Sequence, residues 1–463
     1  MRAGLSWAER LALAAYGVVM RSLQPLLRRK LRRRGQQEPG YLVHMPQRFG
    51  FYDEAPPAPG RVWVHAVSLG ETRAAAILIE TLRGMWPDMR LLLTHSTATG
   101  WAQGQSLLRT GDAQAWLPWD TPEATHRFVQ HHRPRLGILM ETEVWPLLVQ
   151  ACAHAQVPLV LANARLNEKS LHSGLRWSLL SRPAYRGLSA VLAQSLEDAE
   201  RLQQLGAHVQ AVLGNLKFDV PSQPDALALA QVWRRQWQIQ GQPRPVVMLA
   251  STREGEEALW LQALMADADR LAAFRAVGVL WLLVPRHPQR FDEVHALVAA
   301  QGLVVSRRSA WTPGWPAAGD RAEKTEKTEK TEVWLGDSLG EMPVYFQSAD
   351  MALLGGSFMP LGGQNLIEAA AFGCPVIMGL HTFNFAEAAQ NAQAAGAAVR
   401  VGDMDAALDQ VLAWLRRPAE CANARQQGLQ LVAQSRGAAM RYAQAIRQQC
   451  GSLPCSTLAL AVK

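Results

Sequence analysis

The feature that most constrains the fold is a pattern repeated along most of the chain. From residue 61 onward, short aliphatic or β-branched runs are followed by a turn containing Gly, Ser or Thr, and then by a helical stretch. This alternation is typical of βαβ units and parallel sheets. The predicted strands are 62–67, 91–94, 136–140, 159–162, 190–193, 209–213, and then 246–250, 280–284, 303–306, 333–335, 351–354 and 376–378. We therefore expect an α/β protein with two Rossmann-like domains facing each other across a cleft, each on a sheet of about six strands.

Composition along the chain suggests where these domains begin and end. The predicted division is a membrane-anchoring segment at 1–35, a first domain at 41–219, a proline-containing linker at 220–245, a second domain at 246–445, and a tail at 446–463. Within the second domain, residues 322–332 hold a Glu-Lys-Thr repeat and are predicted to form a low-complexity loop.

Charge and cysteine content exclude several classes of protein. The formal net charge is +8 over 463 residues, but most of the excess comes from six basic residues between 28 and 34. A uniformly basic surface, as in nucleic-acid-binding proteins, is therefore not expected. The five cysteines contain no C-x-x-C pair, which indicates neither a disulfide framework nor a zinc site, and favours a reducing compartment.

The amino-terminal segment raises the question of membrane binding. Residues 11–20 are apolar, but Arg10 and Arg21 flank them, so the run is shorter than the roughly 20 residues that cross a bilayer. An apolar stretch followed by a basic cluster suits the surface of a membrane with anionic lipids. We expect residues 5–34 to bind that surface, with the rest of the chain on its cytoplasmic side. A helix packed on the globular body is the alternative.

Polar side chains follow the predicted strands of the first half. Glu71, at the start of a helix, can act as a general base on a substrate hydroxyl or complement the helix dipole. The dipole favours its ionised form, so we expect a rather weak base. Glu141 and Glu143 can pair with cations, position a substrate or cap a helix. Lys217 can neutralise a phosphate or a developing charge, or be a solvated surface residue.

The second half carries candidate anion-binding groups at the same strand ends. Arg253 and Arg286 each follow an apolar strand, and the turns 336–341, 355–357 and 362–368 are rich in glycine. Backbone N–H groups in such turns suit a nucleotide phosphate.

Several motifs are absent from the sequence. No P-loop, G-x-G-x-x-G, G-x-S-x-G or H-E-x-x-H motif occurs, which disfavours P-loop NTPases, dinucleotide dehydrogenases, serine hydrolases and zinc proteases. The two D-x-D sequences, at 267–269 and 403–405, lie in or beside helical stretches and not after strands. We expect no metal in the active site and no cofactor.

Six segments in order along the chain together resemble the 3-deoxy-D-manno-octulosonic acid (Kdo) transferases of lipopolysaccharide synthesis. The segments are Trp63–Thr72, Met140–Pro146, Ala162–Leu166, Gly214–Asp219, Val284–Pro288 and His381–Phe385. The likeness runs from about residue 5 to 445. It implies a GT-B glycosyltransferase at the cytoplasmic face of the bacterial inner membrane, which moves Kdo from CMP-Kdo to a lipid A precursor (lipid IVA) with inversion and without a metal.

The resemblance also implies roles for individual residues. Glu71 matches the general base, and Glu141 and Lys217 match the residues that stabilise the transition state. The matched CMP contacts are Pro285, Arg286, Leu339, Gly340, Glu341, Asn365, Leu366, Ile367 and Glu368, and Arg253 is a further candidate anion contact. The alternatives are another GT-B enzyme with a UDP-sugar donor, or a non-catalytic nucleotide-binding membrane adaptor.

Overall fold

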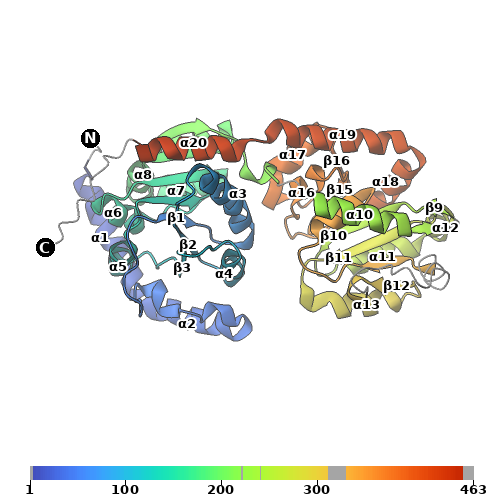
Figure 1. Cartoon of the computed structure of the whole chain (residues 1–463), viewed down its shortest axis with the longest axis horizontal. Coiled ribbons are helices and arrows are strands. Elements are labelled where there is room, and N and C mark those ends of the chain that lie inside the picture. The colour runs from blue at the N-terminus through green and yellow to red at the C-terminus, as the bar shows by residue number, and fades with distance from the viewer. Residues whose placement is uncertain (1–3, 221–222, 240, 311–329, 452–463) are drawn as a thin grey trace. The chain divides into compact units, whose positions relative to one another are not determined.

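The computed structural model describes residues 4–220, 223–239, 241–310 and 330–451. It forms two compact units, one made of the described residues up to Asp219 together with those from Arg436 onward, and the other of Val220–Ser435 (Figure 1). Each unit contains a seven-stranded parallel sheet covered by helices. The α/β prediction with two parallel sheets is therefore confirmed.

The sheet of the first unit has the strand order β3-β2-β1-β4-β5-β6-β7. Its strands are β1 (Val62–His65), β2 (Leu91–His95), β3 (Ala113–Trp116), β4 (Leu136–Met140), β5 (Leu159–Ala164), β6 (Ala190–Ala193) and β7 (Val209–Val212). All pairs are parallel, and the interior strand β1 pairs with β2 and β4. Helices on both faces bury β1 and β4 at every position, which is why these strands read as continuous apolar runs.

Most of the helices that follow the strands of the first sheet start where a polar side chain caps them. They are α3 (Leu69–Met85), α4 (Ala98–Gln105), α5 (Pro122–His132), α6 (Pro146–His154), α7 (Glu168–Arg176), α8 (Ser178–Gly187) and α9 (Leu196–Gln204), with short 3-10 turns η1 (Pro39–Tyr41), η2 (Met45–Phe49) and η3 (Leu216–Phe218). Ser68, Thr97, Thr121 and Ser195 each accept a hydrogen bond from a backbone N–H in the first turn of their helix. These caps follow strand ends and so fix where each helix leaves the sheet.

The amino-terminal helices α1 (Trp7–Ser22) and α2 (Gln24–Gln37) belong to the first unit. Leu13 of α1 is buried, Glu9 pairs with Arg186 of α8, and the Tyr16 hydroxyl donates a hydrogen bond to Asp120. Residues 4–35 of the predicted separate segment therefore pack on the body of the first unit, and binding of this segment to a membrane surface stays a prediction. Within the part of the chain that the structure describes, no helix is both long and apolar enough to cross a membrane.

The carboxyl-terminal helix α20 (Ala438–Gly451) returns to the first unit and packs on α3 (Figure 1). Tyr442 and Ile446 are fully buried there, and the carboxylate of Asp219 accepts hydrogen bonds from the backbone N–H groups of Gly437 and Ala439, at 2.6 and 2.5 Å. The predicted boundaries, 246–445 for the second domain and 446–463 for a tail, are wrong over residues 436–451. Residues 452–463 lie outside the described part.

The sheet of the second unit has the order β12-β13-β11-β10-β14-β15-β16. Its strands are β10 (Val246–Thr252), β11 (Leu280–Pro285), β12 (Val305–Arg307), β13 (Val333–Leu335), β14 (Met351–Leu354), β15 (Val376–Met378) and β16 (Ala398–Arg400). Its helices are α11 (Glu256–Ala266), α12 (Ala268–Val277), α13 (Phe291–Ala299), α15 (Met342–Ser348), α16 (Leu366–Ala371), α17 (Ala386–Ala394), α18 (Met404–Arg416) and α19 (Pro418–Ser435), with 3-10 turns η4 (Pro288–Arg290), η5 (Arg308–Ala310) and η6 (Phe383–Phe385). Most of the predicted loop 322–332 lies outside the described residues.

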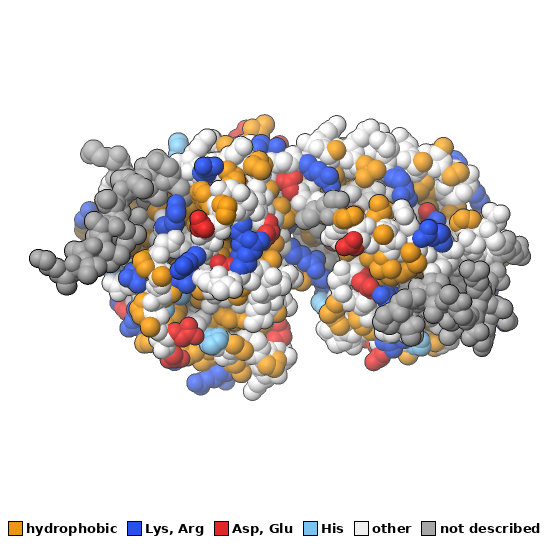
Figure 2. Space-filling model, viewed as in Figure 1, with side chains coloured by type: hydrophobic (Ala, Val, Ile, Leu, Met, Phe, Trp, Pro, Cys, Tyr) orange, Lys and Arg blue, Asp and Glu red, His pale blue; other side chains and the backbone are white. Residues whose placement is uncertain are grey.

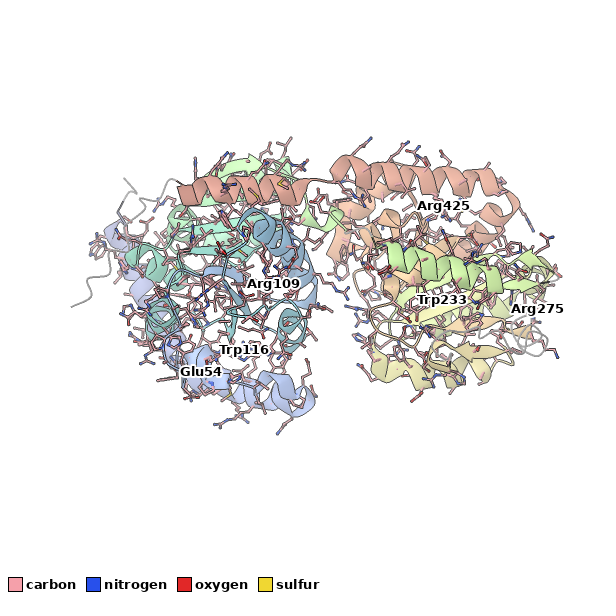
Figure 3. All side chains as sticks on the ribbon, in the orientation of Figure 1. Glu54, Arg109, Trp116, Trp233, Arg275 and Arg425 are labelled. Atoms are coloured by element: carbon pink, nitrogen blue, oxygen red, sulfur yellow. The ribbon has the colours of Figure 1, made fainter. Side chains whose placement is uncertain are left out.

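The predicted linker is part of the second unit. It folds into α10 (Pro224–Gln236) and a short antiparallel pair, β8 (Gln238–Ile239) with β9 (Gln242–Pro243). Trp233, labelled in Figure 3, and Trp237 are buried, and the Trp233 ring lies 5.7 Å from that of Tyr345 in α15. The linker prediction is wrong because Trp233 and Trp237 pack this segment against the rest of the second unit.

Candidate functional site

Glu71 lies in the first turn of α3, just after the end of β1. Its carboxylate accepts hydrogen bonds from the backbone N–H of Val67 at 2.9 Å and from the hydroxyl of Ser68 at 3.2 Å. In return, the Ser68 hydroxyl accepts a hydrogen bond from the backbone N–H of Glu71. The Glu71 side chain therefore lies at the start of the helix, where it can complement the helix dipole. This is one of the two roles that the sequence suggested for it.

Burial raises the pKa of Glu71, and the negative charges of Glu141 and Glu143 raise it further. The hydrogen bond from Val67 and the proximity of His65 act in the opposite direction and are outweighed. The expectation of a weak base, drawn from the helix dipole, is therefore wrong. A partly buried carboxylate among like charges holds a proton more tightly than an ordinary glutamate, so it is a better proton acceptor.

Glu141 follows β4 and is almost completely buried. Its two carboxylate oxygens contact two different cations: the Lys217 Nζ lies at 2.8 Å and the Arg165 Nε at 2.6 Å. Its backbone has a positive φ of 58°, a conformation that is uncommon for residues other than glycine and that occurs at functional sites. Burial raises the pKa of Glu141, but the two cations outweigh burial, so its pKa lies below the usual range.

A buried histidine lies beside these acids. His65 ends β1, and its Nδ1 lies 2.9 Å from the Thr94 hydroxyl oxygen. Its Nε2 lies 3.9 Å from a carboxylate oxygen of Glu143, which also accepts a hydrogen bond from the Trp145 indole at 2.9 Å. Burial raises the pKa of Glu143, but His65 and Trp145 outweigh burial and hold the pKa below its usual range.

Sheet topology explains why these side chains meet. β1, β4 and β5 are neighbours in a parallel sheet, so the residues that follow them share one edge. Lys217, in η3 after β7, is held near that edge because the backbone N–H of Leu216 donates to the Asn163 side chain at 3.0 Å. The structure thus brings together Glu71, Glu141 and Lys217.

Sequence reasoning gave no role to His65 or Arg165, although both lie in segments of the family resemblance. The signal that identified Glu141, a polar residue at the end of a predicted strand, applies to both residues. Arg165 follows directly after β5, and His65 is the last residue of β1.

The predicted CMP contacts lie at the carboxyl edge of the second sheet. Arg253 follows β10, Pro285 ends β11, and the backbone N–H of Arg286 donates to the Thr252 carbonyl at 2.9 Å. Leu339 and Gly340 follow β13, and Gly340 has a φ of 84°, which suits glycine. β13, β11 and β10 are adjacent in the sheet, so these positions share one edge.

The remaining predicted contacts are partly engaged within the protein. The Glu341 carboxylate pairs with the Arg308 guanidinium at 2.7 Å. Asn365 caps α16 by accepting a hydrogen bond from the backbone N–H of Ile367 at 3.2 Å, and Glu368 lies in the first turn of that helix. Leu366 and Ile367 are buried, so their side chains are not accessible to a ligand. Contact of any of these residues with CMP stays a prediction.

The described residues include no metal cluster, and the face drawn in Figure 2 shows no large patch of a single charge. On the face shown in Figure 2, Lys and Arg side chains are interspersed with Asp and Glu. Among the residues that the structure describes, no group of three or more His, Cys, Asp or Glu side chains is arranged to hold a metal ion. Asp267 and Asp403 of the two D-x-D sequences cap α12 and α18.

Comparison with known proteins gives the family. Residues 43–220 match the model of the 3-deoxy-D-manno-octulosonic-acid transferases (kdotransferases), and residues 318–430 match glycosyl transferases group 1. The 3-deoxy-D-manno-octulosonic acid transferase of Bordetella pertussis is 47% identical over 417 residues, which are 87% of this chain and 91% of the relative.

Solved structures give the fold. The Anabaena protein Alr3699/HepE, solved with UDP-glucose, has a TM-score of 0.52 and 16% identity, covering 85% of this chain and all of that one. The C-terminal CMP-Kdo binding domain of WaaA from Acinetobacter baumannii is 28% identical and covers 45% of this chain and 99% of that one, with a TM-score of 0.39. The likeness to Alr3699/HepE concerns the fold alone, which is the GT-B glycosyltransferase fold. On the strength of the Bordetella pertussis relative, the chain belongs to the family of 3-deoxy-D-manno-octulosonic acid transferases.

Proposed function

We propose that the protein transfers Kdo from CMP-Kdo to a lipid A precursor, lipid IVA, with inversion and without a metal ion. One observation supports this most strongly. In a member of the Kdo transferase family, a carboxylate with a raised pKa, Glu71, lies on the sheet edge that also carries Glu141 and Lys217. This is the combination that a reaction needs when it must remove a proton and stabilise charge at one place.

Glu71 is the proposed general base. Its carboxylate takes the proton of an acceptor sugar hydroxyl, and the hydroxyl oxygen forms a bond to the anomeric carbon of Kdo. The bond from that carbon to the CMP phosphate oxygen breaks, and its electron pair leaves with CMP. A single displacement of this kind inverts the anomeric centre. The raised pKa of Glu71 supports the role, because proton transfer is most efficient when the base has a pKa near the working pH.

Each unit carries its own proposed charge-stabilising groups. In the first unit, Glu141 holds the Lys217 ammonium at 2.8 Å and so fixes a cation near the base. In the second unit, the proposed CMP site consists of Arg253, Arg286 and the backbone N–H groups that follow β13 and β14. Cations and N–H groups of this kind stabilise the phosphate of a leaving nucleotide monophosphate.

The amino-terminal helices are the proposed membrane contact, at the cytoplasmic face of the inner membrane. α1 exposes Trp7, with 78% of its surface accessible, and also Leu11, Val18 and Val19, while α2 carries the basic cluster of residues 28–34. Apolar side chains beside Lys and Arg suit an anionic lipid surface, where each basic residue contributes about 1 kcal/mol. Such a contact would keep the enzyme close to its lipid acceptor.

Mass spectrometry of the acceptor tests this function. Purified protein is incubated with CMP-Kdo and a tetraacylated lipid A precursor in detergent with EDTA, and the lipid product is analysed. We expect the lipid to gain the mass of one or more Kdo residues. A control reaction replaces CMP-Kdo by UDP-sugars. Transfer from a UDP-sugar, or no transfer from CMP-Kdo in the presence of EDTA, would contradict the proposal.

A further inference from the structure

We propose that Arg165, together with Lys217, forms a subsite in the first unit that binds an anionic group of a substrate, and that buried Glu141 positions both cations. This inference rests on the proposed function and extends it, because it names a residue that recognises substrate. The group bound is either a phosphate of the lipid acceptor or the carboxylate of the transferred sugar, since both present anionic oxygens to a guanidinium.

The geometry of Glu141 supports this reading. Its side chain is nearly inaccessible, and each of its oxygens faces a different cation, Lys217 at 2.8 Å and Arg165 at 2.6 Å. The backbone N–H of Arg165 also donates to the Glu141 carbonyl at 3.3 Å. Two residues that follow neighbouring strands are thus joined by side chain and backbone. Because Glu141 is enclosed, it acts through Arg165 and Lys217 and not by direct contact with a substrate. Glu141 is therefore a positioning residue.

Arg165 also acts on a second acid. Its charge opposes the rise in the pKa of Asp198, whose carboxylate pairs with Arg201 at 3.8 Å and accepts a hydrogen bond from the backbone N–H of Leu166 at 2.7 Å. Arg165 therefore shares its charge between two carboxylates.

Exposure shows which of the two cations can reach a ligand more easily. The side chain of Arg165 is 48% exposed and that of Lys217 19% exposed, against 2% for Glu141. Arg165 contacts Glu141 through Nε, and a guanidinium has further N–H donors on its two terminal nitrogens. These donors match the spacing of two oxygens of a phosphate or carboxylate. Arg165 also lies at the carboxyl edge of the sheet, where parallel α/β sheets bind ligands.

Steady-state kinetics with both substrates tests the subsite. We expect Arg165→Gln to raise the KM for one substrate by roughly ten- to a hundredfold, the range for loss of a hydrogen bond to a charged group, and Arg165→Lys to restore part of the loss. If the acceptor phosphate is bound, the KM for the acceptor rises, and this rise disappears with a dephosphorylated acceptor. If the sugar carboxylate is bound, the KM for CMP-Kdo rises instead, with either acceptor.

Arg109→Gln is the matched control. Arg109, labelled in Figure 3, forms a 2.6 Å ion pair with Glu80 and is 59% exposed, but it precedes β3 and so lies at the opposite edge of the sheet. Unchanged KM values in both Arg165 variants, with wild-type transfer intact, would overturn this inference and leave the proposed function standing. Failure of wild-type protein to transfer Kdo would refute the proposed function, and with it the basis of this subsite.

Discussion

At the scale of single residues, the first unit places three carboxylates at one edge of the sheet and gives each a different environment. Burial and two negative neighbours raise the pKa of Glu71, whereas Glu141 and Glu143 have cationic or hydrogen-bonding partners that hold their pKa values low. Separation of this kind lets one acid exchange protons at a higher pH than its neighbours, which stay charged. It supports the proposed base role of Glu71 on physical grounds, independently of the family resemblance.

The pH dependence of transfer follows from this separation. Because Glu71 must be deprotonated to act, kcat/KM should fall as the pH decreases through its raised pKa, at a higher pH than for an ordinary glutamate near about 4.3. Glu143→Gln removes one of the charges that raise this pKa, so its acidic limb should shift to lower pH. Glu80→Gln, an exposed acid at the far end of the same helix, is the control and should leave the limb in place. A Glu143→Gln profile that coincides with the wild type would contradict this.

Lys217 should be needed for rate more than for folding. Lys217→Met removes one cation from Glu141, but Arg165 still faces the carboxylate at 2.6 Å, so the buried charge keeps a partner. We expect kcat to fall by roughly a hundred- to a thousandfold, as for loss of a group that stabilises developing charge, with a melting temperature within a few degrees of the wild type. Loss of folding in Lys217→Met, or retention of full kcat, would show that the lysine is structural.

At the scale of elements, α1 is tied to the body through a buried acid. The Asp120 carboxylate accepts hydrogen bonds from the backbone N–H groups of Leu147 and Leu148, at 3.2 and 2.8 Å, and from the hydroxyl of Tyr16 in α1. Burial raises its pKa from 3.8 to about 6. The helix proposed to contact the membrane is therefore held by a group that titrates in the mildly acidic range.

The raised pKa of Asp120 predicts that its contribution to the free energy of unfolding decreases as the pH rises. Since the folded state holds the Asp120 proton more tightly than the unfolded state, the group's contribution to the free energy of unfolding is full below about pH 4 and is lost as the pH rises to about 6. The loss corresponds to about 3 kcal/mol. Asp120→Asn cannot titrate, so the stability of the wild type relative to this variant should decrease by about that amount between pH 4 and pH 7 in urea unfolding. Parallel pH profiles for the two proteins would contradict it.

The elements that sequence reasoning missed have a common physical cause. β3 and β16 are edge strands of their sheets, although the other two edge strands, β7 and β12, were predicted. β3 reads Ala-Gln-Ala-Trp and is only partly buried, so it lacks the continuous apolar run by which the interior strands were predicted. Most of the interior strands, and the catalytic candidates at their ends, could be predicted, because burial on both faces produces a pattern that is visible in the sequence.

Other features could not be read from local patterns. Glu141 was predicted as a residue near the site, but its contacts with Lys217 and Arg165 join positions up to 76 residues apart, which only the folded sheet brings together. Similarly, the pKa of Glu71 is raised by burial and by the charges of Glu141 and Glu143, which follow a different strand. Local reasoning at Glu71 detected the helix dipole and therefore gave the wrong direction for its pKa.

At the scale of the whole molecule, the chain leaves the first unit after Asp219, builds the second unit, and returns through α20 (Figure 1). The apolar residues at 438, 439, 442, 443 and 446 form one face of α20, and this face belongs to the core around α3. The spacing of these residues is visible in the sequence. Their packing partner, α3, is not, because α20 follows the second domain in the chain. The first unit is therefore discontinuous in sequence.

A charge on the buried face of α20 should destabilise the first unit selectively. We expect Ile446→Asp, which places a carboxylate in a fully buried position, to lower stability by about 3 kcal/mol or more. Hydrogen exchange should accelerate in β6, whose carbonyl at Ala193 accepts a hydrogen bond from Tyr442 at 3.1 Å, but not in β10. Met440→Asp, on the exposed side of the same helix, is the control. Equal acceleration in β6 and β10 would contradict the discontinuous first unit.

The central claim is that Glu71 removes the proton of the acceptor, and a single-turnover comparison tests it most directly. Wild type, Glu71→Gln and Glu80→Gln are each mixed in excess with limiting lipid A precursor and saturating CMP-Kdo, and the rate of Kdo transfer is measured. We predict a loss of about a hundred- to ten-thousandfold in Glu71→Gln, the range for removal of a general base, with unchanged affinity for CMP-Kdo and a wild-type rate in Glu80→Gln. A Glu71→Gln rate close to that of the wild type would contradict the mechanism.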